Sequence, residues 1–269
     1  MPTIFTCPVC KEPLYIEGRT YKCQNNHCFD MAKEGYVNLL VGSKSTDFSG
    51  DDKQMVSSRT RFLEGGYYYP LRDKISSLIT QYSNGDSVLL DAGCGEGYYT
   101  NAYSEICAHT AGIDISKSAI RHAAKKCKNA EFAVASVYHL PIADACADII
   151  VNCFSPNAPE EFARVMKDTG VLFYVVPSPR HLWELKSILY DTPYENEEKT
   201  EEYEKLKLCG IEKISFDFLL NNNDDIMALF GMTPYAWNTP SEGIKRLQNT
   251  ESLRVTADFA IHIYKKAPI

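Results

Sequence analysis

The sequence of 269 residues predicts a doubly wound α/β domain with a small cysteine-rich module in front of it. Short apolar runs alternate with segments of helical periodicity, which is typical of a parallel sheet. The runs lie near residues 87–91, 109–114, 130–135, 147–152 and 170–177. The helical segments lie near residues 97–107, 116–127, 159–167 and 179–190. Four of the ten cysteines fall before residue 30, which sets the first segment apart from the rest.

The cysteine-rich module has the spacing of a zinc ribbon. Cys7 and Cys10 form a Cys-x-x-Cys knuckle, and Cys23 and His27 follow beyond a short hairpin. Three thiolates and one imidazole make a closed tetrahedral zinc site, which is structural because no position is left for water. A piece this small needs such a staple. Cys28, next to His27, is the alternative fourth ligand. A redox Cys-x-x-Cys is disfavoured, because no thioredoxin-like helix follows it.

The region between the module and the sheet predicts a linker and two helices. Val41–Asp52 is rich in Gly, Ser, Thr and Asp, which is typical of a mobile linker. Lys53–Leu63 and Tyr69–Tyr82 have helical spacing and are expected to lie against the sheet domain as a lid. The predicted domains are therefore a ribbon at 1–40, a linker and lid at 41–85, and the sheet domain at 86–269.

The first buried run ends in a glycine-rich turn. Asp91 closes the run, and Gly93, Gly95 and Gly97 follow at alternate positions before a helix. The spacing departs from the Gly-x-Gly-x-x-Gly that seats a pyrophosphate. An acid at the strand end suits a cationic nucleoside without phosphates. We therefore expect S-adenosylmethionine, with Asp91 facing the ammonium of its methionine part.

A second acid supports the nucleoside site. Asp114 ends the next apolar run, where a carboxylate would accept the two ribose hydroxyls. Ser116 is expected to cap the helix that follows. Ligands of such sheets lie at the carboxyl ends of the strands. Ser136 after the third strand is thus expected to border the adenine, and Asn152 and Ser155 after the fourth to orient the methyl acceptor.

The remaining segments carry less information. Tyr194–Tyr203 is strongly acidic and is expected to be a solvated insertion, and residues 211–220 and 253–265 alternate like a closing pair of strands. Trp237 is expected in the core. The six scattered cysteines are expected to be reduced core thiols.

Composition excludes some classes of function. A net charge of −7 argues against general coating of nucleic acid, although lysines and arginines recur along the predicted helix 116–127. The sequence holds no apolar run of membrane length and no basic-then-apolar leader, so we expect a cytoplasmic location.

Distinctive motifs occur at residues 29–40, 62–73, 91–100, 179–186 and 232–237. Together with the cysteine and histidine ligands, these motifs resemble the RlmA family, bacterial enzymes that methylate N1 of a guanine in a hairpin loop of 23S ribosomal RNA. The resemblance covers nearly the whole chain, and the segment that follows the zinc knuckle is its most specific part.

The resemblance implies a class I methyltransferase domain, a zinc module that helps to bind RNA, and a homodimer. It also implies that Tyr68, Gly95, Glu96 and His181 touch the cofactor. Residues 152–156 depart from the pattern that the family has after the fourth strand. The resemblance therefore identifies the pocket for the guanine base less directly than the cofactor site.

Three other functions are compatible with the sequence. Cys153 follows the fourth strand, where a cytosine-C5 methyltransferase places its nucleophile. An RNA-binding protein with a vestigial cofactor fold is a second interpretation, although the intact acids and glycines of the turn speak against it. A methyltransferase acting on a small molecule or protein is a third, which the zinc module disfavours.

Overall fold

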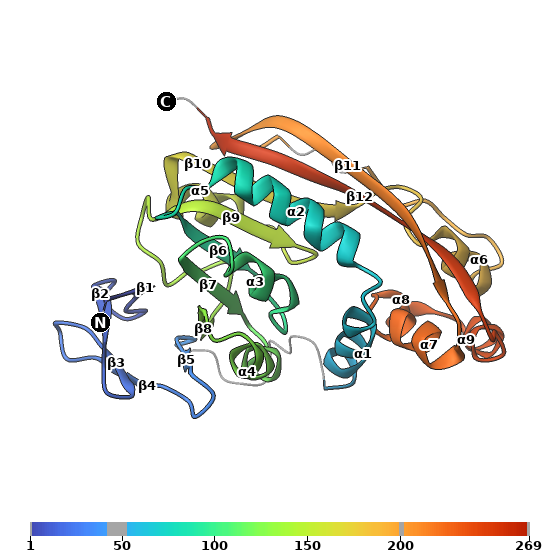
Figure 1. Cartoon of the computed structure of the whole chain (residues 1–269), viewed down its shortest axis with the longest axis horizontal. Coiled ribbons are helices and arrows are strands. Elements are labelled where there is room, and N and C mark those ends of the chain that lie inside the picture. Colours follow the sequence, from blue (N-terminus) through green and yellow to red (C-terminus); the bar gives the residue numbers. More distant parts are fainter. Residues whose placement is uncertain (1, 42–52, 199–201, 268–269) are drawn as a thin grey trace.

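The computed structural model describes residues 2–41, 53–198 and 202–267. A small sheet at the N-terminus lies beside one large twisted sheet with helices packed around it (Figure 1). The predicted linker falls almost wholly on residues 42–52, outside the described part of the chain. No described helix is long and apolar enough to cross a membrane.

The small sheet is antiparallel, with its strands in chain order. Its strands are β1 (Pro2–Thr6), β2 (Pro13–Glu17), β3 (Thr20–Lys22) and β4 (Cys28–Asp30). The predicted hairpin is β2–β3, with Gly18 at φ +61° in its turn. Phe5, Leu14 and Tyr21 are buried together with residues of the large domain, and the Thr6 N–H donates to the Pro141 carbonyl at 2.8 Å. The ribbon is therefore docked on the domain through a shared apolar core.

The large sheet has eight strands in the order β11-β12-β10-β9-β6-β7-β8-β5. They are β5 (Tyr36–Asn38), β6 (Val88–Ala92), β7 (His109–Asp114), β8 (Ala130–Val134), β9 (Ala147–Cys153), β10 (Met166–Pro177), β11 (Leu206–Leu220) and β12 (Leu253–Lys266). Strands β5 to β10 are parallel, while β12 and β11 close the sheet as an antiparallel pair. This confirms the predicted doubly wound sheet. The strand order reverses between β6 and β9, so a ligand crevice is expected at their carboxyl ends.

Strand β5 belongs to the large sheet although it lies within the range assigned to the ribbon. It pairs in parallel with β8, and the Leu39 N–H extends the pairing to the Val134 carbonyl at 2.9 Å. Tyr36 and Val37 are buried there. The segment that follows the zinc knuckle thus forms an edge strand and ties the ribbon to the domain.

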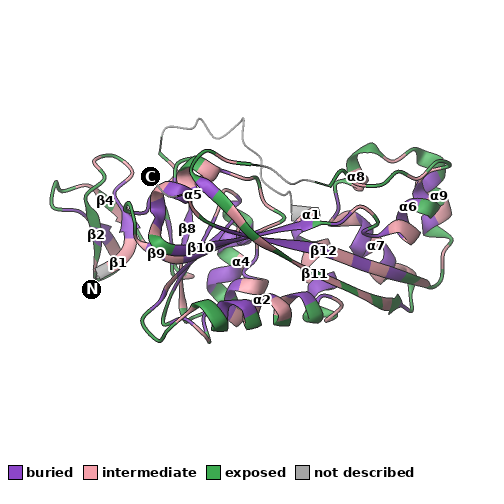
Figure 2. Ribbon diagram, turned by 90° about the horizontal axis from the view of Figure 1, so that it is seen from above, coloured by how far each residue is buried: buried purple, intermediate pink, exposed green. Residues whose placement is uncertain are grey.

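Helices cover both faces of the sheet. They are α1 (Lys53–Glu64), α2 (Tyr69–Tyr82), α3 (Tyr98–Tyr103), α4 (Lys117–Lys126), α5 (Pro159–Val165), α6 (Trp183–Leu189), α7 (Asn223–Gly231), α8 (Tyr235–Asn238) and α9 (Ser241–Gln248). Leu71, Ile75 and Ile79 of α2 pack with one set of sheet residues, and Phe162 of α5 packs with the other. Figure 2 shows the buried residues concentrated along the central strands, with exposed residues on the outer helices.

The helices α7, α8 and α9 were not expected from the sequence. The Asn222 side chain caps α7 by accepting the Asp225 N–H at 2.9 Å, a local signal that the sequence does carry. Helix α1 lies against α7, away from the centre of the sheet (Figure 1). The helical layer beyond the strand ends is therefore larger than predicted, and it supplies much of the wall that faces the glycine turn.

Candidate functional site

The glycine-rich turn after β6 requires glycine for different reasons at each position. Gly93, Gly95 and Gly97 all have positive φ, at +82°, +53° and +77°. A Cβ on Gly93 would overlap the side chain of Ser155, and one on Gly97 would come within 2.8 Å of the Ala123 Cβ. Gly95 has open space, with Arg59 Nη1 nearest at 3.7 Å. Gly93 and Gly95 therefore shape the crevice, whereas Gly97 allows α3 and α4 to approach.

Asp91 is buried at the end of β6. Its Oδ2 accepts a hydrogen bond from the Thr100 hydroxyl at 2.6 Å. Burial raises the pKa of Asp91 to about 7, and the Thr100 hydrogen bond opposes this only in part. A carboxyl in this state gains strongly from a cationic ligand, because a positive charge would stabilise its ionised form.

Asp114 holds the tip of β7 against the glycine turn. Its Oδ2 accepts the Gly95 N–H at 2.9 Å, and its Oδ1 accepts the Ser116 N–H at 2.7 Å. A carboxylate oxygen can accept more than one hydrogen bond, so these contacts are compatible with a ligand hydroxyl at the same group. Ser116 also caps α4, as predicted, by accepting the Ala119 N–H at 3.4 Å.

A cleft of about 1080 Å³ lies at the carboxyl ends of the strands. Most of the predicted cofactor residues border it, together with the predicted base-orienting Ser155. These residues are Tyr68, Asp91, Gly93, Gly95, Glu96, Asp114, Ser136, Ser155 and His181. Three carboxylates and one guanidinium, that of Arg59, are among its lining groups. This balance favours a cationic ligand over a pyrophosphate.

Asn152 and Gly97 do not border the cleft. Asn152 is fully buried, and its Nδ2 donates to the carbonyl oxygens of Ala92 at 3.2 Å and Pro156 at 3.1 Å. Its side chain therefore anchors the loop after β9 to the end of β6. Asn152 was expected to face the methyl acceptor. Its side chain is instead buried against the end of the neighbouring strand β6.

Tyr68 and Glu96 border the cleft from the side of α1. Tyr68 is buried among aromatic rings, with the Phe259 centroid 5.3 Å from its own. Glu96 accepts the Thr60 hydroxyl at 2.5 Å, which ties α1 to the glycine turn. Burial raises the pKa of Glu96. Helix α1 thus borders the cleft, while α2 packs on the sheet away from it.

His181 is buried at the start of the segment that leads into α6. Its Nδ1 accepts the Asp258 N–H at 3.2 Å, and its ring lies 4.4 Å from the Phe259 ring. Burial lowers the pKa of His181 to about 3. The ring is therefore neutral at pH 7, with its proton on Nε2, and can serve as a hydrogen-bond donor but not as a proton acceptor through Nδ1.

The opposite side of the cleft is aromatic, and the sequence reasoning missed it. Tyr190, Tyr194, Tyr235 and Trp237 border the cleft there, and we call these four residues the aromatic wall.

Trp237 is 65% exposed, so its expected place in the core is wrong. Tyr194 and Asn196 border the cleft, so the start of the expected solvated insertion is part of the site; residues 199–201 lie outside the described chain. Cys209 is exposed, unlike the core thiol expected.

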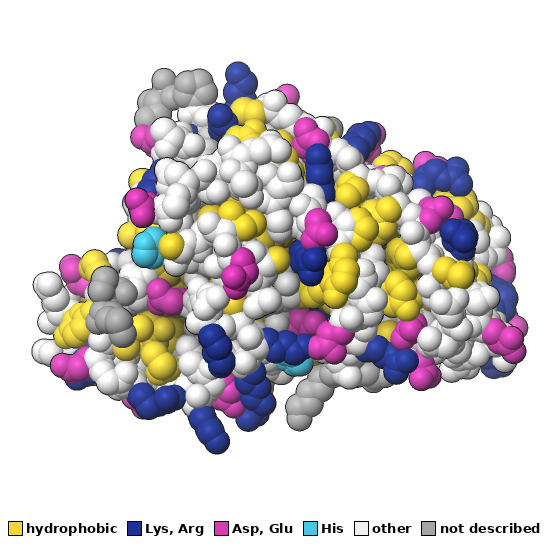
Figure 3. Space-filling view, viewed as in Figure 1, with side chains coloured by type: hydrophobic (Ala, Val, Ile, Leu, Met, Phe, Trp, Pro, Cys, Tyr) yellow, Lys and Arg dark blue, Asp and Glu magenta, His cyan; other side chains and the backbone are white. Residues whose placement is uncertain are grey.

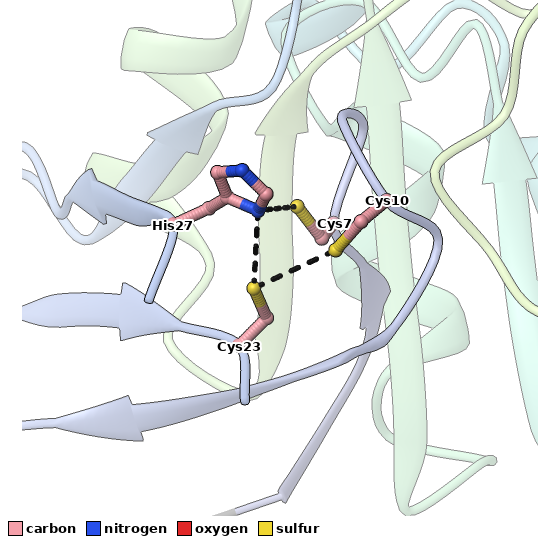
Figure 4. A group of neighbouring side chains, drawn as sticks. All are labelled: Cys7, Cys10, Cys23 and His27. Carbon is pink, nitrogen blue, oxygen red and sulfur yellow. Dashed lines mark hydrogen bonds between the residues drawn. The ribbon is translucent and has the colours of Figure 1, made fainter. Parts of the chain in front are cut away.

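The zinc-ribbon residues converge at one point between the strands (Figure 4). The ligand atoms of Cys7, Cys10, Cys23 and His27 all lie within 4.8 Å of one another. His27 Nδ1 lies 3.5 Å from Cys7 Sγ and 3.4 Å from Cys23 Sγ, while the sulfurs of Cys10 and Cys23 are 3.7 Å apart. Tetrahedral zinc bonds imply separations of about 3.8 Å between sulfurs and about 3.5 Å between sulfur and nitrogen. The donor set fits a zinc ion.

Cys28 is not part of this group. It is exposed, and its Sγ approaches the Asn26 carbonyl at 3.5 Å. The alternation of side chains along β4 directs it away from the group that His27 joins. Among the described residues, His27 is therefore the fourth donor.

Comparison with known proteins agrees with the geometry. A family profile described as "Methyltransferase domain" matches residues 90–174. The crystal structure of the YcgJ protein from Bacillus subtilis matches with a TM-score of 0.50 at 17% identity, covering 72% of this chain and 98% of that one. The fold and the site together define a class I methyltransferase that depends on S-adenosylmethionine.

The N-terminal module and two relatives narrow the class to one family. A profile described as "RlmA, N-terminal" matches residues 5–46. The "Putative 23S rRNA (guanine-N(1)-)-methyltransferase YxjB" of Bacillus subtilis strain 168 is 32% identical, covering 98% of both chains. The "23S rRNA (guanine(748)-N(1))-methyltransferase" of Streptomyces fradiae is 35% identical, covering 68% of this chain and 66% of that one. This chain belongs to the RlmA family of rRNA (guanine-N1)-methyltransferases.

Proposed function

We propose that this protein transfers a methyl group from S-adenosylmethionine to N1 of a guanine in a hairpin loop of 23S ribosomal RNA. The observation that carries the proposal is the cleft, which joins an acidic nucleoside crevice to an aromatic wall. The nucleoside crevice consists of Asp91, Gly93, Gly95, Asp114 and Ser136. A loop base is unstacked at lower cost than a paired one, so a hairpin loop suits a cleft that must enclose the base.

The residues of the crevice have separate roles in this proposal. Asp91 would hold the ammonium of the methionine part, Asp114 the ribose hydroxyls, and Ser136 would border the adenine. Tyr68, Glu96 and His181 would complete the cofactor's surroundings. When bound, S-adenosylmethionine supplies a methyl group on a positively charged sulfur. The protein must align that carbon with N1 and keep water out of the cleft.

The loop after β9 would orient the guanine. Ser155 lies against Gly93 at the edge of the crevice, and the buried Asn152 side chain fixes the loop from behind. Phe154 has a positive φ of +56° and its ring packs 5.2 Å from the Phe259 ring. The loop therefore has a defined shape from which backbone carbonyls and the Ser155 hydroxyl can meet the base. Asn152 acts in this proposal by positioning the loop.

Guanine N1 carries a proton that must leave during the transfer. His181 is unsuited to accept it, since its Nδ1 is occupied by the Asp258 N–H and its Nε2 carries the ring proton. His181 would instead donate a hydrogen bond from Nε2.

The cytosine-C5 alternative requires Cys153 to act as a thiolate. Burial, and to a smaller degree Asp91, raise the pKa of the Cys153 thiol well above its ordinary value. A neutral thiol is a poor nucleophile. The environment of Cys153 therefore disfavours the covalent cytosine-C5 reaction.

Replacing Cys153 with alanine is expected to leave methyl transfer within about threefold of the unchanged protein, since the thiol is not needed. The measurement is transfer of labelled methyl groups to unmodified 23S RNA. A loss beyond about hundredfold, together with a protein–RNA adduct that survives denaturation in the unchanged protein, would instead establish the covalent route.

We also propose that the ribbon binds one structural zinc ion through Cys7, Cys10, Cys23 and His27. The Asn25 side chain and the backbone near Glu12 lower the pKa of the Cys10 thiol to about 6, which favours its thiolate. Four protein ligands leave no position for a reacting water, so zinc would stabilise the ribbon and not take part in the transfer.

Removal of a zinc ligand is expected to release the metal and loosen the ribbon. Cys23→Ser should reduce the zinc content from one ion per chain to well below one, measured by metal analysis of the purified protein. Cys28→Ser is the matched control and should retain the zinc. Loss of zinc in the control with retention in Cys23→Ser would show that the ligand set is wrong.

The arrangement of basic side chains supports RNA as the partner. Lys and Arg side chains gather along the lower edge of Figure 3, over β4 and α4. Lys117, Arg121, Lys125 and Lys126 of α4 are exposed, although Arg121 pairs with Glu34 and Lys126 pairs with Glu64. This local face lies on α4, which contacts β5, the edge strand of the large sheet that ties the ribbon to the domain. It would let an RNA hairpin contact ribbon and domain together despite the net charge of −7.

Two further parts of the proposal rest on the family alone. A homodimer would widen the RNA-binding surface, and sedimentation of the purified chain tests it. A cytoplasmic location would follow from a ribosomal RNA substrate.

The vestigial alternative is tested by calorimetry with S-adenosylmethionine. Saturable heat at a ratio of one ligand per chain is expected.

The transfer itself is tested by incubating the protein with unmodified 23S RNA and the cofactor, then mapping reverse-transcription stops. A methyl group on N1 blocks base pairing, so one new stop within a hairpin loop is expected. Stops spread over the RNA, or none, would contradict the proposal.

A further inference from the structure

The cleft is larger than its nucleoside crevice requires. Its volume of about 1080 Å³ lies at the upper end of the range of roughly 300–1,000 Å³ that is usual for a pocket holding one small molecule. The glycine turn and its two carboxylates use only one side of it. The aromatic wall borders the other side, and the ring faces there have no role in holding the cofactor in the function proposed above.

A buried lysine contacts two tyrosines of the aromatic wall. Lys186 of α6 is 0% exposed. Its Nζ donates to the Tyr194 carbonyl at 3.0 Å and to Asn196 Oδ1 at 2.7 Å. The same ammonium lies 4.5 Å from the centroid of the Tyr194 ring and 5.5 Å from that of Tyr235. Lys186 thus joins two parts of the wall that come from distant segments of the chain.

The charge of Lys186 has no ion pair with any described carboxylate. Burial lowers its pKa, and the more distant Glu195 opposes this. A buried cation is costly unless hydrogen bonds and ring faces compensate it, so its presence needs a reason beyond packing. An apolar side chain would fill the same space at lower cost. What lysine adds is a fixed geometry for the two tyrosine rings and for residues 194–196, which accept its hydrogen bonds.

Helix α6, which carries Lys186, and Asn196, which contacts it, are both hydrogen-bonded to strands of the sheet or to the residue that follows β10. Glu184, near the start of α6, accepts the Thr256 N–H and the Thr256 hydroxyl, each at 3.0 Å. Asn196 is anchored to the end of β10, since its Nδ2 donates to the Ser178 carbonyl at 2.8 Å. The wall is therefore built on the sheet through α6, although Tyr194 lies in a segment without regular secondary structure.

The rings of the wall present surface to the cleft. Tyr194 is 51% exposed, while Tyr190 lies 5.5 Å from it and 6.4 Å from Tyr235 between ring centroids. Exposed aromatic faces at a cleft stack on nucleobases, since every base has a π face. A base that has left its own stack loses such contacts and regains them on a wall of this kind.

We propose that the aromatic wall stacks on the extruded purine or a base next to it, and that Lys186 is the positioning residue that holds the wall in shape. This inference rests on the function proposed above and adds the place where the RNA base is held. It also gives a role to the motifs at residues 179–186 and 232–237, which the nucleoside crevice leaves largely unused.

The first test replaces Tyr194, because a side chain that is 51% exposed can be changed without disturbing the packed core. Tyr194→Phe keeps the ring and should retain kcat/KM for unmodified 23S RNA within about twofold. Tyr194→Leu keeps an apolar side chain without a ring and should lower kcat/KM by about tenfold or more, mainly through KM for RNA. Both variants should bind S-adenosylmethionine in calorimetry as the unchanged protein does.

Lys186→Met is the second test, with Lys245→Met on the exposed face of α9 as its control. Lys186→Met should lower kcat/KM for RNA by about tenfold or more with unchanged cofactor affinity, and the control should have no effect. If Lys186→Met fails to fold, the Tyr194 pair decides. Retention of kcat/KM by Tyr194→Leu in a protein that methylates RNA would overturn this inference alone. Absence of RNA methylation by the unchanged protein would overturn the proposed function and this inference with it.

Discussion

Replacing Asp91 with asparagine is expected to weaken S-adenosylmethionine binding by about tenfold or more at pH 8, because a charge-assisted hydrogen bond to the ammonium is lost. The same change should make the ligand-free protein more stable at that pH. Burial raises the pKa of Asp91 from 3.8 to about 7, so the folded chain holds a proton that the unfolded chain releases. Ionisation of the buried carboxyl therefore costs stability as the pH rises.

The pH dependence follows with a definite sign. Between about pH 4 and pH 7 the folded state binds more protons at Asp91 than the unfolded state does. The free energy of unfolding of the ligand-free chain therefore falls across this window, by on the order of 4 kcal/mol from this group. Cofactor affinity should change in the opposite direction, rising by up to about tenfold per pH unit until the pH passes 7, since the ammonium needs the carboxylate form.

Calorimetry and chemical unfolding from pH 5 to pH 8 measure both effects. Asp91→Asn should show neither dependence to the same extent. Asp168→Asn, at an exposed side chain that pairs with Lys266, is the control and should change neither quantity appreciably. Equal cofactor affinity of Asp91→Asn and the unchanged protein at pH 8 would show that Asp91 does not face the ammonium.

Gly93→Ala is expected to abolish measurable methyl transfer. The residue has φ +82°, where an L side chain costs about 1–2 kcal/mol, and its Cβ would overlap the side chain of Ser155. The chain can relieve the overlap only by moving the turn or the loop after β9, and either movement disrupts the cleft. The measurement is cofactor affinity and methyl transfer, with the melting temperature recorded in parallel.

Two other glycines separate strain from overlap. Gly35 has φ +107°, and no atom lies within 4 Å of the position that a Cβ would take there, so Gly35→Ala carries strain alone. Gly85 has open space and carries neither effect, so Gly85→Ala is the neutral control. Adding Ser155→Gly to Gly93→Ala removes the overlap and should restore part of the cofactor affinity. Full activity of Gly93→Ala would show that the turn tolerates a side chain and that the crevice is misassigned.

The sequence was informative where local pattern and topology act together. The apolar runs that end in Asp91 and Asp114 form β6 and β7, and the topology of a parallel sheet then places both acids at one edge. The spacing of Cys7, Cys10, Cys23 and His27 likewise identified the ribbon, because the reach of one metal constrains these positions directly. Both predictions depend on chemistry that short segments carry by themselves.

The aromatic wall could not be predicted, because it forms only when distant segments meet. Lys186 and Tyr235 lie far apart in sequence, and nothing in their neighbours requires them to approach. Asn152 shows a related limit. The end of β9 was placed correctly, but which face of the strand its side chain takes depends on packing against β6. Trp237 was expected in the core and not as a stacking platform, whereas α8 lies at the cleft and leaves it exposed.

The central claim is that the cleft brings a methyl donor and N1 of guanine together. The most direct measurement is digestion of 23S RNA treated with the protein and labelled S-adenosylmethionine, followed by identification of the labelled nucleoside by mass spectrometry. We expect the label in 1-methylguanosine, with Asp91→Asn forming much less of it. Label in 5-methylcytidine, in another methylated nucleoside, or in no nucleoside would contradict the account.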